Sequence, residues 1–150
     1  MLKQTEADRE VSVPKIIVTK PLQGHSALSN VIDFRAGTDL VYPLYSTDLR
    51  ESFYLDLYRP TKNPAKLKVQ LRTVSDDILV RLDVNGSPHT NPDRVRKGKT
   101  HLHTYREGDG DDWAETLDPA LFSSPNDPAA AFRDFCKYCN IIVGLIGIHV

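Results

Sequence analysis

Three segments in the middle of the chain alternate apolar and polar side chains with a period of two. They are 51–59, 66–74 and 77–84, and the second shows the pattern with Leu67, Val69 and Leu71. In a strand this alternation places all the apolar side chains on one face and the polar ones on the other. One-sided burial is typical of antiparallel sheets, whose second face can meet water. The sequence therefore predicts an antiparallel sheet in this region.

Weaker patterns extend this sheet and add helices. We expect further strands at 40–45 and 100–107, a short edge strand at 15–19 and a short helix at 26–34. Near the C-terminus, Asn126 or Asp127 can cap a helix that has Pro128 at its first position. The apolar residues that follow have helical spacing and end near residue 140; they are Ala131, Phe132, Phe135, Cys136 and Cys139.

The predicted fold class is α+β: an antiparallel β-sheet of about five strands with a C-terminal helix packed on one face. Residues 1–12 are polar and weakly patterned, so we expect a mobile N-terminal arm followed by a single α+β domain at 13–150. The Cys-x-x-Cys pair at 136 and 139 lies on the apolar helix face, which predicts buried core thiols.

Composition excludes several classes of protein. A chain of 150 residues that is 40% hydrophobic is neither disordered nor, with two cysteines, a disulfide scaffold. The N-terminus lacks the apolar run of a signal peptide, and the ten residues 141–150 are too short to span a bilayer. We expect a cytoplasmic protein that makes no membrane contact.

Charge is distributed unevenly although the net charge is only −1. Segment 59–99 has ten Lys or Arg against four Asp or Glu, whereas segment 106–134 has two against eight. Two solvated faces explain this pattern, and so does a basic surface that binds the phosphate backbone of RNA. The candidate RNA-binding residues are Arg94, Arg96, Lys97 and Lys99.

Histidines and a tyrosine alternate along one expected strand. His101, His103 and Tyr105 share a strand face, and His89 lies just before the basic loop. Two imidazoles can act as general acid and base in RNA cleavage, with Arg81 stabilising the charged phosphate and Tyr105 positioning it or stacking on a base. This hypothesis needs no cofactor. An alternative interpretation treats the histidines as polar residues of a solvent-facing strand.

A metal site is the second alternative for the same residues. His101 and His103 are followed by Glu107, a His-x-His and Glu spacing found in metal-binding double-stranded barrels, and His89 adds a fourth ligand. Val95 and Ala114 stand where that pattern has glycines, and no second motif follows.

The motifs RLDVNGSPHTN, HLHTY and KYCNI resemble those of a family of short bacterial and prophage-encoded proteins. The similarity covers roughly 40–141 and includes Arg81, Asp83, His89, His101 and His103. This resemblance implies a toxin–antitoxin or phage-conflict setting but no particular activity. Our first hypothesis is a small metal-independent ribonuclease-type toxin or RNA-processing protein. Its rival is a non-enzymatic interaction module that binds a cognate antitoxin, phage or host protein through the sheet face or Trp113.

Overall fold

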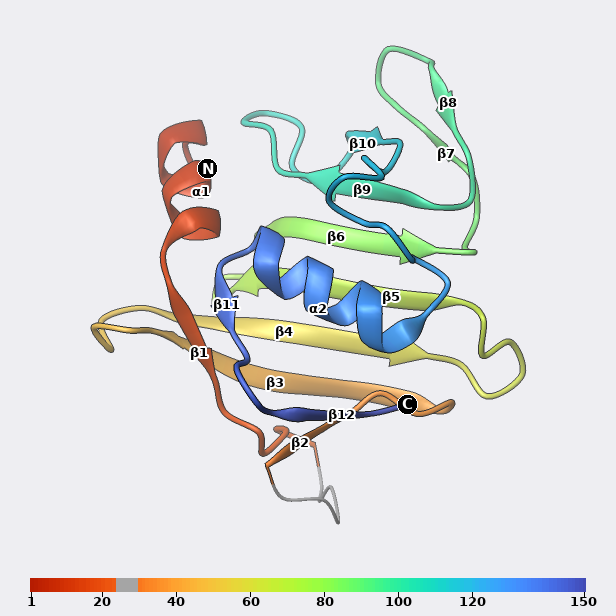
Figure 1. Ribbon diagram of the computed structural model, residues 1–150. Coiled ribbons are helices and arrows are strands. Elements are labelled where there is room, and N and C mark those ends of the chain that lie inside the picture. The colour runs from red at the N-terminus through yellow and green to blue at the C-terminus, as the bar shows by residue number, and fades with distance from the viewer. Residues whose placement is uncertain (24–29) are drawn as a thin grey trace.

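The computed structural model describes residues 1–23 and 30–150, and its main feature is a twisted sheet of eight strands (Figure 1). The strand order is β10-β9-β6-β5-β4-β3-β1-β11, and only the β1–β11 pair is parallel. The strands are β1 (Lys15–Ile17), β3 (Thr38–Ser46), β4 (Ser52–Arg59), β5 (Leu67–Thr73), β6 (Ile78–Val84), β9 (His101–Thr104), β10 (Ala114–Glu115) and β11 (Ile141–Ile142).

Helix α2 (Pro128–Tyr138) crosses one face of the sheet (Figure 1) and closes the core. Its start confirms the sequence prediction, because the Asp127 side chain accepts hydrogen bonds from the amides of Ala129 and Ala130 and Pro128 opens the first turn. Phe132, Phe135 and both cysteine thiols are fully buried, as their helical spacing predicts. The apolar side chains of β4, β5 and β6 meet this helix in one continuous core.

The α+β class and the C-terminal helix are confirmed, but the expectation of about five strands is wrong. The outer strands β10 and β11 are two residues long and carry no readable periodicity. Lys15–Ile17 forms a strand, as predicted, but not an edge strand, because β11 pairs on its outer side. Of the short helix expected at 26–34, the described part contains β2 (Val31–Asp33), and residues 26–29 lie outside the described residues.

The N-terminal segment also differs from expectation. Instead of a mobile arm, residues Gln4–Ser12 form helix α1, with Ala7 buried against the core. Long-range hydrogen bonds attach it to the turn after β9: Gln4 Nε2 donates to the carbonyl of Tyr105, and the Gln4 amide donates to Glu107 Oε1. These contacts connect positions a hundred residues apart, so no local sequence pattern indicates them.

Two small ribbons complete the structure: β2 with β12 (Gly147–His149), and β7 (His89–Thr90) with β8 (Arg96–Lys97). The first packs beside α2, where the rings of Phe34 and Phe132 meet edge to face at 6.3 Å. The second projects from the sheet edge near β9 (Figure 1). Neither helix that the structure describes is long and apolar enough to span a bilayer.

Candidate functional site

Pairing of β6 with β9 brings the polar motifs together. In this antiparallel register Asp83 lies opposite His101 and Arg81 lies opposite His103. The β7–β8 hairpin then carries His89 over the same place, with its ring centroid 5.9 Å from that of His101 and 4.6 Å from that of His103. The two β9 rings are 4.8 Å apart. The three imidazoles that the sequence analysis assigned to one candidate site therefore gather at one place.

Backbone carbonyls fix the orientation of the two β9 imidazoles. His101 Nδ1 lies 2.7 Å from the Gly98 carbonyl and His103 Nδ1 lies 2.7 Å from the Asp111 carbonyl. A carbonyl only accepts, so each Nδ1 carries a proton and donates it. In the neutral ring Nε2 is then the atom with a free lone pair. The two backbone carbonyls thus fix the directions in which the Nε2 atoms of His101 and His103 point.

Both Nε2 atoms point at one carboxylate oxygen. Asp83 Oδ2 is 3.3 Å from His101 Nε2 and 3.2 Å from His103 Nε2. The three potential ligand atoms all lie within 4.8 Å of one another. We call Asp83, His101 and His103 the Asp–His–His cluster. Its two histidines are 2% and 1% exposed, so their rings are shielded from bulk water.

The Arg81 guanidinium contacts two members of the cluster, Asp83 and His103. Its Nε donates to Asp83 Oδ2 at 3.1 Å, its Nη2 lies 3.0 Å from His103 Nε2, and its Nη1 donates to Asp111 Oδ2 at 2.6 Å. The guanidinium can only donate, so His103 Nε2 accepts in this contact. The pair Arg81–Asp111 also connects the basic middle segment with the acidic segment that follows it.

Burial and the neighbouring positive charges shift the pKa of Asp83 in opposite directions. Burial alone raises the pKa of this carboxyl, but the hydrogen bond from His101 and the charge of Arg81 outweigh it, and the net pKa lies well below the usual range. The hydrogen bond to Asp83 in turn raises the pKa of His101. The Asp83 carboxylate is therefore ionised throughout the neutral pH range and is available as an anionic ligand.

The cluster lies at one side of a pocket of about 300 Å³. The three histidines, Asp83 and Arg81 form part of the lining, which also includes Tyr58, Lys66 and Lys68. Cations thus outnumber the single lining carboxylate. This lining favours an anionic ligand. Sequence reasoning did not identify Tyr58, Lys66 or Lys68, although each lies in or beside an alternating segment on the polar side.

Two expected site residues lie elsewhere. Tyr105 follows the end of β9 and turns into the core, where its hydroxyl donates to the Leu2 carbonyl, so it does not share the pocket. Glu107 lies in the turn after β9 and accepts from the Gln4 amide, so it is not the carboxylate beside the histidines. Asp83 holds that position because cross-strand register, not sequence distance, decides which carboxylate lies near His101.

His89 lines the pocket, but its Nε2 donates to the Asp112 carbonyl at 2.6 Å.

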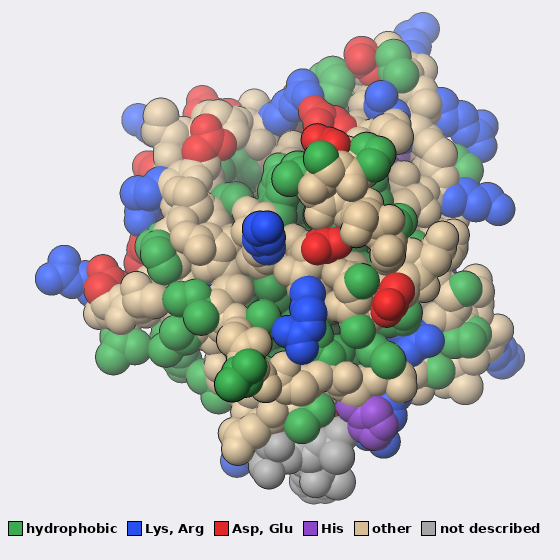
Figure 2. Space-filling view, viewed as in Figure 1, with side chains coloured by type: hydrophobic (Ala, Val, Ile, Leu, Met, Phe, Trp, Pro, Cys, Tyr) green, Lys and Arg blue, Asp and Glu red, His purple; other side chains and the backbone are tan. Residues whose placement is uncertain are grey.

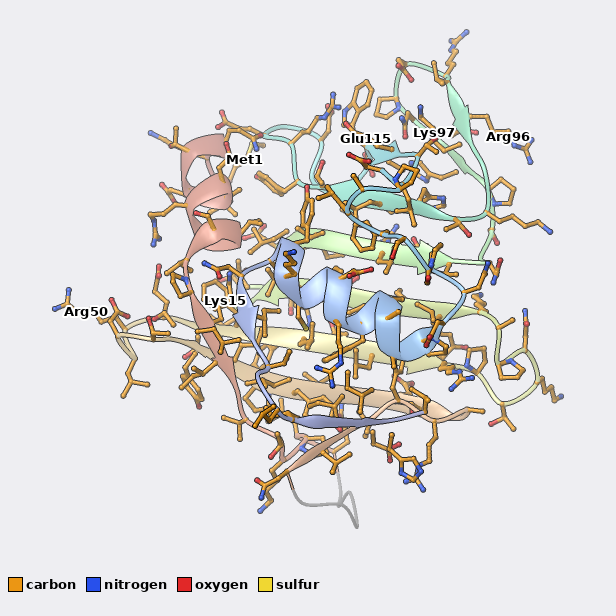
Figure 3. The ribbon with its side chains drawn as sticks, viewed as in Figure 1. Met1, Lys15, Arg50, Arg96, Lys97 and Glu115 are labelled. Atoms are coloured by element: carbon orange, nitrogen blue, oxygen red, sulfur yellow. The ribbon has the colours of Figure 1, made fainter. Side chains whose placement is uncertain are left out.

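The expected RNA-binding residues project from the β7–β8 hairpin and the turn after it. Arg96 and Lys97 are labelled in Figure 3, and basic side chains extend from the same corner in Figure 2. Arg94, Arg96 and Lys99 are exposed, and none of the four basic residues lines the pocket. They form a separate basic rim beside it.

Comparison with known proteins gives a family but no activity. No curated protein and no solved structure matches the chain. One family model, described as a family of unknown function (DUF6978), matches residues 2–141 and therefore includes α1, the pocket and α2. On that match, the chain belongs to the DUF6978 family.

Proposed function

We propose that the protein is a metal-dependent hydrolase of phosphate esters, with one divalent ion held by the Asp–His–His cluster. The observation that carries this proposal is the convergence of His101 Nε2 and His103 Nε2 on Asp83 Oδ2 at 3.2–3.3 Å. Two ligands bound ~2.1 Å from one ion are separated by ~3.0 Å at a right angle and ~3.4 Å at the tetrahedral angle. Both histidine–aspartate distances therefore match the spacing of ligands around one ion, and all three ligand atoms lie within 4.8 Å of one another.

The surroundings of the cluster support a metal site of the catalytic kind. Metal-binding histidines usually donate their second ring N–H to a carbonyl or carboxylate, as His101 and His103 do through Nδ1. Three protein ligands leave a coordination position free for water or substrate, and the adjoining pocket provides the space. Imidazole and carboxylate ligands suit zinc and neighbouring transition metals.

Arg81 has a defined place in this proposal. An ion bound to all three ligands would take the lone pair of His103 Nε2 and would displace Arg81 Nη2 from that atom. The 2.6 Å bond to Asp111 keeps the guanidinium at the pocket wall. From there it stabilises the charge that develops on a phosphoryl group during hydrolysis.

The residues of this chain divide the hydrolysis between them. An ion held by Asp83, His101 and His103 would supply a water molecule of lowered pKa, and hydrolysis would join the oxygen of that water to phosphorus as the ester P–O bond breaks. The leaving oxygen takes its proton from solvent water, because a neutral His89 ring that donates through Nε2 to the Asp112 carbonyl has no proton on Nδ1. The products are an alcohol and a phosphate.

The test combines metal binding with activity. We expect zinc to bind with a stoichiometry of one by calorimetry, and Asp83→Asn or His103→Ala to weaken binding by more than about 100-fold. His149→Ala is the matched control, because His149 lies on β12, away from the cluster. Hydrolysis of bis(p-nitrophenyl) phosphate should require the metal. Absence of zinc binding to the folded wild type, or hydrolysis unchanged by EDTA, would overturn the proposal.

Metal-independent RNA cleavage is the second candidate, and the different environments of the two imidazoles favour it. Asp83 raises the pKa of His101, whereas His103 accepts from Arg81, so one ring is suited to be an acid and the other a base. However, both nitrogens of each ring already have partners within the protein. This chemistry needs His101 or His103 to leave Asp83, whereas metal binding uses the arrangement as it stands. EDTA-resistant RNA cleavage that His101→Ala abolishes would favour it.

The wider setting follows from the sequence resemblance alone. In that setting the enzyme acts in the cytoplasm as a toxin or in phage conflict, with RNA as its substrate and a cognate protein as its inhibitor. Co-purification of a neighbouring gene product that suppresses hydrolysis is the test of this role.

A further inference from the structure

A row of four side chains crosses the sheet on the face opposite α2. Strand register pairs Tyr58 with Lys68, Lys68 with Asp83, and Asp83 with His101. Residues in register on neighbouring strands point to the same face, and the strands are ~4.8 Å apart. An aromatic ring, an ammonium group and the Asp–His–His cluster therefore stand in line, and all four side chains line the pocket.

Lys68 is free to bind an anion. Although it stands opposite Asp83 in register, no acidic side chain in the described part of the chain forms an ion pair with Lys68 or with Lys66. Arg72, on the same strand and face, is engaged by Asp56 and Asp76. The unpaired charge on this face is thus concentrated at the pocket, next to the cluster.

Tyr58 adds an aromatic surface to the same wall. Its side chain is half-buried, and the Lys68 ammonium lies over its ring, 5.7 Å from the ring centroid. When Lys68 turns from the ring to bind a phosphate, that face of the ring opens to a group attached to the phosphate. Nucleobases stack on aromatic side chains, which contributes to binding whatever the base. A pocket of about 300 Å³ is at the lower end of the range for small-molecule sites and favours a single nucleotide unit.

We infer that the pocket recognises a nucleotide, with its phosphate between Lys68 and the Asp–His–His cluster and its base on Tyr58. This inference rests on the proposed function for the reaction, and it names the substrate class: a nucleotide phosphate ester, not a sugar or lipid phosphate. Lys66 and Arg81 provide the flanking positive charge. Tyr58 and Asp83 lie two strand spacings apart, ~10 Å along the sheet, and the nucleotide has to span this distance from its base to its phosphate.

The experiment compares three probes by calorimetry in EDTA: inorganic phosphate, adenosine and adenosine 5′-monophosphate. We expect the nucleotide to bind at least tenfold more tightly than phosphate. Tyr58→Leu should remove most of that advantage and leave phosphate binding unchanged, and Lys68→Gln should weaken both probes several-fold. The matched controls are Tyr54→Leu, four residues away on the same strand and face, and Lys62→Gln, an exposed residue outside the pocket.

The outcomes separate this inference from the proposed function. Equal affinities for the nucleotide and for phosphate, or equal effects of Tyr58→Leu and Tyr54→Leu, would overturn it. Tyr58→Phe retains the ring and should restore nucleotide binding, which guards against a folding defect in Tyr58→Leu. Zinc binding is measured separately. If the protein binds the nucleotide but does not bind zinc, this inference stands and the metal-dependent reaction is excluded.

Discussion

Lys15 is fully buried, and its titration should be visible in the free energy of unfolding. Its ammonium donates to the carbonyls of Val11, Val13 and Cys139 at 2.8–2.9 Å, joining the end of α1, β1 and the end of α2 (Figure 3). Three donors meet three acceptors, so the hydrogen bonds are complete. Burial nevertheless lowers the pKa of Lys15 from 10.5 to about 8, because the interior disfavours the charge.

The sign of the pH effect follows from proton linkage. Between pH 8 and pH 10.5 the unfolded chain keeps the Lys15 proton that the folded protein has lost, so the free energy of unfolding rises with pH in this interval. With a folded pKa of about 8, the increase between pH 7 and pH 9.5 is about 2 kcal/mol. Lys15→Met has no amine and lacks this increase.

Urea unfolding of the wild type and of Lys15→Met at pH 7 and pH 9.5 measures the effect. The difference in unfolding free energy between the two proteins should grow by about 2 kcal/mol, since every other titrating group is common to both. Lys62→Met, at an exposed position, should show no such growth. A Lys15→Met difference that stays constant or shrinks as pH rises would refute the claim that burial disfavours the Lys15 charge.

Three further predictions concern separate parts of the molecule. Asp127→Ala removes the cap of α2 and should lower stability by about 1 kcal/mol, read as a fall in Tm of roughly 2–4 °C. Zinc at 100 times its Kd should stabilise the wild type by about 2.7 kcal/mol and Asp83→Asn by less than about 0.4 kcal/mol, as thermal melts with and without EDTA will show. If the basic rim binds single-stranded RNA, the slope of log K against log salt should be about −3 and should flatten when its four cations are replaced by Gln. Those cations are Arg94, Arg96, Lys97 and Lys99.

The sequence alone determined the elements whose signals are local. Period-two alternation predicted β4, β5 and β6, because neighbouring side chains of a strand must point to opposite faces. The Asp127–Pro128 start and the apolar spacing after it predicted α2, because capping and helix periodicity depend on residues within one or two turns. Alternation within β9 also placed His101 and His103 on one face.

Only the tertiary structure decided which groups meet the histidines. Glu107 is nearer to His103 in sequence, yet Asp83 lies beside both imidazoles because β6 and β9 pair in one particular register. Tyr58 and Lys68 reach the pocket through two further strand pairings, which local patterns do not reveal. Likewise α1 and the two-residue strands depend on contacts between distant segments. Alternation fixes the face on which a side chain lies, whereas register, which is non-local, fixes its neighbours.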